Sequence, residues 1–244
     1  MKKSIYLLLL IVCISCIHKP ATITSKKGEI VLIDSCFNAI QDSAYLAYLA
    51  PIKAGLEEQL GAPIGYAPRD LEVYQPECPM LNWASDALLA KARELSPQQV
   101  DVAVVNIGGM RCNWGAGDIT FRHVFELMPF DNELVVLTLP GKEVIALCEV
   151  FAKGGGEGIA GMSMKAEKGV LKYAKIAGAA IQPDALYTVA TSDYLSQGND
   201  GMKPLKNHTA IWKSERKIRD LYIEYIQQVQ RVEAQVDGRM QIIK

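Results

Sequence analysis

The segment most informative about the fold is Val100-Asp101-Val102-Ala103-Val104-Val105-Asn106-Ile107-Gly108-Gly109, a near-continuous apolar run that leads into two glycines. A run this apolar and this rich in valine predicts a strand that is buried on both faces. Paired glycines let backbone amides approach a ligand closely, because no side chain intervenes. The stretch therefore predicts a core strand with a candidate binding loop at its end.

Helical and strand patterns alternate irregularly on both sides of this strand. Helices are predicted over residues 45–60, 79–95, 121–128 and 141–151, and a long helix with Ile218 and Leu221 on its apolar face is expected to be capped by Ser214. Strands are predicted over residues 29–34, 100–107, 133–139, 161–165, 170–176 and 187–192. The irregular order favours an α+β fold, a single layered domain with mixed sheets flanked by helices.

The composition and charge of the chain limit the kinds of ligand that can be expected. The chain has 244 residues, half of them hydrophobic, and a net charge of -1. This length suits one globular domain with a full core. The charge balance offers no basic face for neutralising a nucleic-acid backbone, so we expect a small-molecule ligand and no nucleic-acid polymer.

The N-terminus has the pattern of an export signal. Lys2 and Lys3 precede an apolar run over residues 5–12, which is far shorter than the ~20 residues of a membrane-spanning helix. The run ends at Cys13-Ile14-Ser15-Cys16, which resembles a bacterial lipoprotein signal whose lipidated residue is Cys16; an ordinary secretory peptide is the alternative. We expect a signal peptide at 1–15, a tether at 16–28 and the folded domain at 29–244. The protein would then be exported and held by its lipid at a membrane, on the periplasmic side or at the cell surface.

Residue types that hold metals are scarce. Hydrolysis of a phosphate ester by a two-metal centre needs several His, Asp and Asn ligands around ions ~4 Å apart. The chain has three histidines, His18, His123 and His208, and no Asp-x-His, Gly-His-x-His or His-x-x-His pattern. No Gly-x-Ser-x-Gly elbow supports a Ser-His-Asp triad. We therefore predict no metal, no cofactor and no catalytic residue in this chain, and we expect His123 to be structural.

Two other patterns are set aside. Gly156-x-Gly158-x-x-Gly161 matches a dinucleotide fingerprint, but that fingerprint works between a strand and a helix. Here a helix precedes it and a strand is predicted to follow, so no Rossmann site is expected. The spacing of the cysteines after the anchor fits no disulfide framework or zinc site, and each is expected to be a buried small hydrophobe: Cys36, Cys78, Cys112 and Cys148.

Three loop segments carry candidate ligand-binding groups. Asn106-Ile107-Gly108-Gly109-Met110-Arg111 combines paired glycines with an arginine that can bind phosphate or carboxylate oxygens. Pro129-Phe130-Asp131-Asn132 and the segment from Ser192 to Gly201 each place an aromatic ring in a loop. Two such rings can enclose a nucleobase, and an acidic residue can accept both hydroxyls of a ribose. Taken alone, the glycine segment is better explained as a tight turn with a surface arginine, and the two further segments change that balance.

In this order and spacing, the three segments resemble the C-terminal domain of the bacterial and animal 5'-nucleotidase family. The similarity extends to Glu77-Cys78-Pro79-Met80-Leu81-Asn82, which looks like the family's opening helix, and to Leu139-Pro140-Gly141-Lys142-Glu143-Val144. It runs from about residue 30 to the C-terminus.

The resemblance implies a set of roles. In the family this domain binds the nucleoside part of the substrate and presents it to a separate N-terminal metallophosphoesterase domain. Phe130 and Tyr194 would stack on the base, and Asp200 would hold the ribose. Asn106, Gly109 and Arg111 would line the base and phosphate side, and Asn132 and Gly161 would complete the pocket.

Several positions depart from the family pattern. Tyr194 stands where phenylalanine is common, and Asn199 stands where a second glycine is common. Pro76 and Glu77 occupy the region where some members place an additional phosphate-binding arginine, which predicts a weaker hold on phosphate.

The leading hypothesis is the substrate-binding half of a split nucleotide phosphohydrolase, which acts in nucleotide catabolism with a metallophosphoesterase made as a separate chain. Divalent metals would then be bound only by that partner, and this chain would be inactive alone. The alternative is a stand-alone nucleoside-binding lipoprotein without catalysis, and a weaker third reading is a hydrolase with an unrecognised nucleophile.

Overall fold

The structure is a computed structural model that describes residues 23–32 and 42–244. The chain forms two compact units, Met1–Leu49 and Ala50–Lys244, and the predicted boundary at residue 29 lies inside the first. The lipidation residue Cys16, the signal peptide and Cys36 lie outside the described residues. Residues 23–32 have no regular secondary structure, so the strand predicted over 29–34 is wrong for its described part.

The helix α2 spans Ser43–Leu60, as its apolar periodicity predicts, and it ends where Gly61 N donates to Glu57 O at 2.9 Å. Among the described residues, no helix combines the length and the apolar character needed to cross a membrane.

The second unit is built around a five-stranded mixed sheet with the order β10-β4-β9-β2-β5. Its strands are β2 (Val102–Val105), β4 (Glu133–Pro140), β5 (Gly158–Ala160), β9 (Leu186–Ser192) and β10 (Ala210–Lys217). β9 and β2 are parallel, and the other neighbours are antiparallel. This mixed sheet with flanking helices confirms the predicted α+β class.

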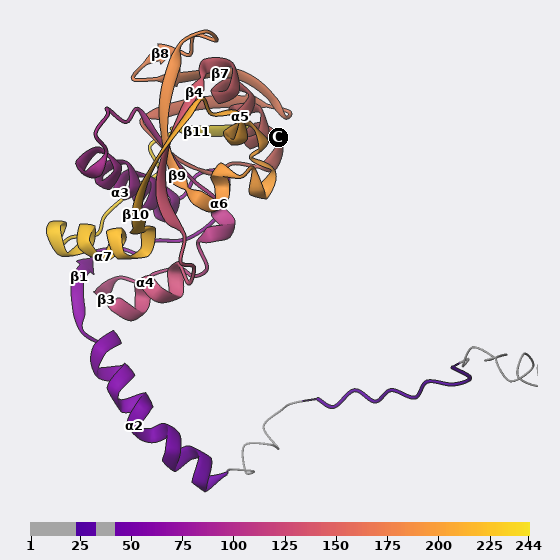
Figure 1. Cartoon of the computed structure of the whole chain (residues 1–244), viewed down its shortest axis with the longest axis vertical. Coiled ribbons are helices and arrows are strands. Elements are labelled where there is room, and N and C mark those ends of the chain that lie inside the picture. Colours follow the sequence, from indigo (N-terminus) through magenta and orange to yellow (C-terminus); the bar gives the residue numbers. More distant parts are fainter. Residues whose placement is uncertain (1–22, 33–41) are drawn as a thin grey trace, which may run out of the picture. The chain divides into compact units, whose positions relative to one another are not determined.

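Both faces of this sheet are covered, which explains the unbroken apolar run in β2. Ala103 and Val105 belong to one core, whereas Val102 and Val104 belong to the other, because successive side chains of a strand point to opposite faces. Helices α3 (Pro79–Leu95) and α7 (Ile218–Val229) cover the first face. Helix α5 (Gly141–Gly154) and a second sheet cover the other (Figure 1).

The second sheet has the order β11-β6-β7-β8, and a two-stranded sheet pairs β1 with β3. The strands β6, β7 and β8 are consecutive along the chain, whereas the β1–β3 and β11–β6 pairs join distant segments. Their bounds are β1 Pro63–Ala67, β3 Gly117–Thr120, β6 Met162–Glu167, β7 Val170–Ile176, β8 Ala179–Ala180 and β11 Met240–Ile243. Two short helices, α4 (Phe121–Leu127) and α6 (Asp193–Ser196), lie next to the loops of interest.

One predicted helix start is wrong. Ser214 lies in the strand β10 and not at a helix cap, because residues 210–213 pair with β4 along its edge. The Ser214 hydroxyl donates to Leu134 O at 2.8 Å, and α7 begins only at Ile218.

Candidate functional site

Strand pairing brings the three candidate loops to one edge of the five-stranded sheet. β2 and β9 are parallel, with Ala103 opposite Ala190, so both strands end at the same edge. β4 is antiparallel to β9, with Leu134 opposite Ser192, so β4 begins there. The segments after β2, before β4 and after β9 therefore meet, although they are far apart in the sequence.

A cavity of about 370 Å³ opens where these loops meet. Its volume falls within the range of small-molecule sites, about 300–1,000 Å³. Seven residues predicted from the sequence line it, together with Gly108 and Met128, which were not predicted: Asn106, Gly109, Arg111, Phe130, Asn132, Tyr194 and Asp200.

The carboxylate of Asp200 links two of the loops. Its Oδ1 accepts a hydrogen bond from the Tyr194 hydroxyl at 2.9 Å, and its Oδ2 accepts one from Asn106 Nδ2 at 2.5 Å. The bond to Asp200 raises the pKa of the Tyr194 hydroxyl above its ordinary value. Asp200 has φ 52°, a left-handed conformation that aspartate tolerates better than most residues. The exposed carboxylate is thus held at the cavity wall by donors from both sides.

The loop that carries Phe130 is anchored by charge. Arg219 of α7 donates to Asp131 Oδ1 at 2.7 Å and to Phe130 O at 3.4 Å, and Lys217 donates to Asp131 Oδ2 at 2.9 Å. These bonds, that of Lys217 first, hold the pKa of Asp131 below its usual range. The Arg219 guanidinium also lies 4.3 Å from the centre of the Phe125 ring.

The loop that carries Tyr194 is held by hydrogen bonds between its own residues. Asp193 Oδ1 accepts from Tyr194 N at 2.8 Å, and Asn199 Nδ2 donates to Tyr194 O at 2.8 Å. The glycine-to-asparagine departure at Asn199 therefore adds a contact to the loop. Phe130 and Tyr194 are 38% and 41% exposed, so both rings have surface available to a ligand.

The glycine turn after β2 is a single 3-10 turn, Ile107–Gly109, so β2 is shorter than the predicted strand. A Cβ atom at Gly109 would lie 2.8 Å from Asn106 Oδ1, which explains why a side chain is not accommodated there. Arg111 N donates to Leu127 O at 2.8 Å, and Arg111 Nη1 donates to Gly108 O at 3.1 Å. The exposed guanidinium supplies the positive charge in the cavity wall.

Gly161 does not line this cavity, so its predicted place in the pocket is wrong. It connects β5 to β6 with φ 76°, and a Cβ atom there would lie 2.1 Å from Asp101 O. The constraint that requires glycine is close backbone packing. Gly161 instead borders a separate surface hollow that includes Asp86 and Arg239. The helix α5 precedes the glycine-rich segment, and the strand β5 begins within it at Gly158. This is the order of elements for which no Rossmann site was expected.

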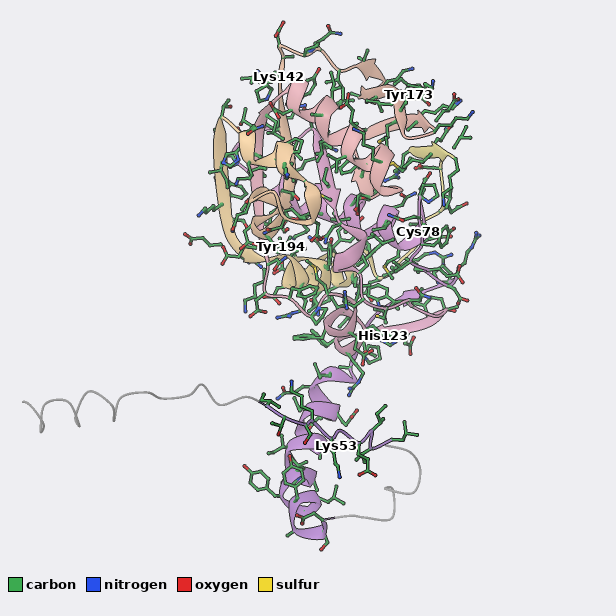
Figure 2. The ribbon with its side chains drawn as sticks, turned by 90° about the vertical axis from the view of Figure 1, so that its right-hand side faces the viewer. Lys53, Cys78, His123, Lys142, Tyr173 and Tyr194 are labelled. Atoms are coloured by element: carbon green, nitrogen blue, oxygen red, sulfur yellow. The ribbon has the colours of Figure 1, made fainter. Side chains whose placement is uncertain are left out.

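The described histidines make structural contacts. His123 Nδ1 accepts from Thr120 N at 3.0 Å, and its carbonyl accepts from Trp114 Nε1. His123 lies well apart from Tyr194 (Figure 2). His208 Nδ1 contacts Leu205 O at 2.9 Å. Within residues 23–32 and 42–244, no group of three or more His, Cys, Asp or Glu side chains is placed to hold a metal ion.

Two further sequence expectations have a structural explanation. Glu77 is buried and accepts hydrogen bonds from Asn82 Nδ2 at 2.8 Å and Asp237 N at 2.9 Å, so it organises the C-terminal segment away from the cavity. Cys78 and Cys148 are buried, as expected of small hydrophobes, and burial raises the pKa of the Cys148 thiol to about 12. The expectation is wrong for Cys112, which is only partly buried at the edge of the first core.

Sequence reasoning missed the residues that position the loops. Asp193 lies in the predicted segment directly before Tyr194, but nothing in the sequence shows that its side chain bonds across to β4. Arg219 is 88 positions from Asp131, so no local motif connects the two residues. Met128 stands next to the predicted Pro129-Phe130 loop, and this adjacency is the signal that would have found it.

Comparisons with known proteins identify relatives of this chain. A family model described as "5'-nucleotidase, C-terminal domain" matches residues 60–207, more than half of the chain. The 5'-nucleotidase of Vibrio cholerae is 29% identical over 186 residues, which is 74% of this chain and 34% of that protein. Protein UshA of Escherichia coli is 28% identical over 196 residues, covering 78% of this chain and 35% of its own length.

A solved structure shows the same fold. The 5'-nucleotidase precursor from Thermus thermophilus superposes with a TM-score of 0.72 at 26% identity, over 82% of this chain and 42% of that one. The chain thus spans about a third of the length of the curated relatives that it matches. The chain belongs to the 5'-nucleotidase family, and its residues 60–207 match the C-terminal domain of that family.

Proposed function

We propose that this domain binds the nucleoside part of a nucleotide in the cavity at the edge of the five-stranded sheet. The observation that carries the proposal is the convergence of two exposed aromatic rings, a carboxylate and a guanidinium on one cavity. Each group suits a different part of a nucleotide, and the match to the 5'-nucleotidase C-terminal domain supports a nucleotide as the ligand of the cavity.

The roles follow from the chemistry of each side chain. The rings of Phe130 and Tyr194 offer stacking surfaces to a base, each worth about 1–3 kcal/mol. Asp200 accepts hydrogen bonds from the ribose hydroxyls through the lone pairs that Tyr194 and Asn106 leave free. Arg111 attracts the phosphate as a permanent charge, while Gly109 and Asn132 border the bound ligand.

We further propose that a metallophosphoesterase on a separate chain performs the hydrolysis, so that the two chains together degrade nucleotides. The sequence supports this, because its three histidines form no Asp-x-His, Gly-His-x-His or His-x-x-His pattern of the kind that a two-metal centre needs. The divalent metals would be held by the partner. The lipoprotein signal ending at Cys16 would place the complex outside the cytoplasm, at a membrane surface.

A second candidate function is nucleoside capture without hydrolysis. It is favoured by the buried position of Glu77, where some family members have a phosphate-binding arginine. In this case Arg111 is the one cation among the described residues that line the cavity, and adenosine would bind nearly as well as AMP.

The experiment uses the chain from Cys16 onward and a metallophosphoesterase chain encoded beside it that carries Asp-x-His, Asn-His and Gly-His-x-His. Calorimetry with adenosine, AMP and other nucleosides measures binding, and phosphate release from AMP is followed with each chain alone and with both. We expect binding by this chain, no phosphate release by it alone, and metal-dependent release with both. Chelator-sensitive release by this chain alone would overturn the split-enzyme proposal, and failure to bind any nucleoside or nucleotide would overturn the binding role.

A further inference from the structure

The hydroxyl of Tyr194 joins the aromatic wall of the cavity to its carboxylate. It donates a hydrogen bond to Asp200 Oδ1 at 2.9 Å, within the loop that follows β9. The bond raises the pKa of the Tyr194 hydroxyl, so the group keeps its proton at neutral pH and remains a donor. Both residues line the cavity, so this hydrogen bond lies in the wall that a ligand would contact.

A second side chain closes the same loop. Asn199 Nδ2 donates to Tyr194 O at 2.8 Å, so two successive residues, Asn199 and Asp200, are bonded back to Tyr194. The loop is fixed at both ends by Leu195 and Met202, which are buried in the core on the α5 side of the sheet. Tyr194 and Asn199 are also the two positions at which this loop departs from the family pattern. The two departures therefore act together on the backbone that carries Asp200.

The Tyr194 bond leaves the Asp200 carboxylate able to accept hydrogen bonds from a ligand. An ionised carboxylate has two oxygens with about four lone-pair positions. Tyr194 occupies one position on Oδ1, and Asn106 Nδ2, at 2.5 Å, occupies one on Oδ2. Each oxygen thus keeps capacity for one further hydrogen bond, which matches the two adjacent hydroxyls of a ribose.

The order of this carboxylate in the free protein affects how well it can bind a sugar. Asp200 is exposed, and among the described residues Tyr194 and Asn106 supply its side-chain hydrogen bonds. A side chain held by a single donor has to be ordered by the ligand, and that ordering lowers the affinity. Loss of the Tyr194 hydroxyl should therefore weaken the binding of ligands that bond to Asp200, and of those ligands only.

We propose that the Tyr194 hydroxyl, supported by Asn199, is a positioning group that makes the cavity selective for nucleosides with two adjacent sugar hydroxyls. This inference rests on the proposed function and deepens it, because it names ribonucleosides, and not dideoxynucleosides, as the preferred ligand class. The ring of Tyr194 stacks on the base, while its hydroxyl acts on the ribose through Asp200. One side chain thereby couples the recognition of two parts of the ligand.

The test uses Tyr194→Phe, which keeps the ring and removes only the hydroxyl. Calorimetry compares adenosine with 2',3'-dideoxyadenosine, which has the same base and lacks both ribose hydroxyls. We expect adenosine to bind roughly two- to tenfold more weakly to the variant, as for the loss of one net hydrogen bond. Dideoxyadenosine should bind the variant and the wild type equally well.

Two further variants complete the comparison. Asn199→Ala removes the supporting bond and should show the same pattern with a smaller loss of adenosine affinity. The matched control is Tyr173→Phe, because Tyr173 is an exposed tyrosine of β7 that does not line the cavity and lies apart from Tyr194 (Figure 2). This control should bind both ligands as the wild type does.

A double-mutant cycle separates positioning from direct contact with the ligand. Asp200→Gly removes the carboxylate, and glycine adopts the φ of 52° at this position without strain. If the hydroxyl acts through Asp200, adding Tyr194→Phe to Asp200→Gly should cause no further loss of adenosine affinity. A further loss as large as that in the wild-type background would show direct contact, and the positioning role would be wrong.

The proposed function and this inference fail in different ways. If the wild-type chain binds no nucleoside or nucleotide, the proposed function fails and the role of the hydroxyl fails with it. If the wild type binds adenosine, but Tyr194→Phe loses affinity for both ligands equally or for neither, nucleoside binding stands and the ribose role of the hydroxyl is wrong. Thermal melts identify any variant that does not fold, and Tyr194→Phe should melt as the wild type does because the bond it loses is exposed.

Discussion

The carboxylate of Asp193 accepts a hydrogen bond from the backbone amide of Glu133 at 3.0 Å. The same oxygen accepts from Tyr194 N at 2.8 Å. One side chain thus joins the start of β4, which follows the Phe130 loop, to the start of the Tyr194 loop. Asp193 therefore ties the two ring-bearing loops to each other.

Asp193→Ala should loosen both aromatic loops. It removes two hydrogen bonds, one part-buried and one exposed, each worth at most about 0.5–1.5 kcal/mol, so thermal stability should fall slightly and adenosine affinity should fall with the order of the loops. Asp193→Asn retains an acceptor oxygen and should recover most of the affinity, whereas Asp184→Ala, at an exposed turn, serves as the control. Wild-type binding by Asp193→Ala would show that the rings do not need this link. Calorimetry and thermal melts provide the readouts.

Replacing either Phe130 or Tyr194 by alanine should weaken adenosine binding about ten- to a hundredfold, because one stacking face is lost. Both rings are more than a third exposed, so the melting temperature should change little. Tyr173→Ala is the matched control, because this ring is 37% exposed and lies apart from Tyr194 (Figure 2). Lower stability with intact binding by the folded fraction would identify the rings as structural.

Asp200→Asn should narrow the preference for adenosine over 2'-deoxyadenosine. A carboxylate gains charge-assisted hydrogen bonds from a ribose diol only when both hydroxyls are present. Binding of the two nucleosides by wild type and variant, measured side by side, gives the ratio. An unchanged ratio would mean that Asp200 serves only to hold Tyr194 and Asn106.

Arg111→Ala should weaken AMP binding more than adenosine binding. The salt dependence of AMP binding should also flatten, because a charge–charge attraction is removed. Arg69→Ala is the control, since this exposed arginine lies 3.9 Å from Glu233 and does not line the cavity. Equal losses for both ligands would make Arg111 a structural or base contact and would favour nucleoside capture as the function.

Asp131 should contribute to stability in a pH-dependent way. The hydrogen bonds from Lys217 and Arg219 hold its folded-state pKa below the unfolded value, so its contribution is present above about pH 4 and is lost as the pH falls through the folded-state pKa. Denaturant unfolding of wild type and Asp131→Asn should therefore differ at pH 7 and converge in acid. A difference that persists at pH 2 would contradict this assignment.

The local sequence pattern was sufficient to predict the longer helices and strands. The predicted helix over residues 79–95 coincides with α3, because a proline at its first turn and apolar periodicity both act within the segment. The strand over residues 170–176 likewise coincides with β7. The residue types of the three loops, and their resemblance to a nucleotide-binding family, were also readable without coordinates.

The pairing of strands that are distant along the chain could not be predicted from the sequence. β10 forms because residues 210–213 bond to the edge of β4, and the local sequence around Ser214 favoured a helix cap instead. Strands β1, β3, β5 and β11 are five residues or shorter, and each exists through a partner elsewhere in the chain.

Local patterns were enough to predict the α+β class, the main helices and the chemical groups available to a ligand. Which of these groups share a cavity became visible only in the folded chain, where Asn106, Phe130 and Tyr194 lie at one sheet edge and Gly161 lies elsewhere. The supporting contacts of Asp193 and Arg219 likewise appear only there. Interstrand hydrogen bonds and burial set the register of the strands, and both depend on residues that are dozens of positions apart.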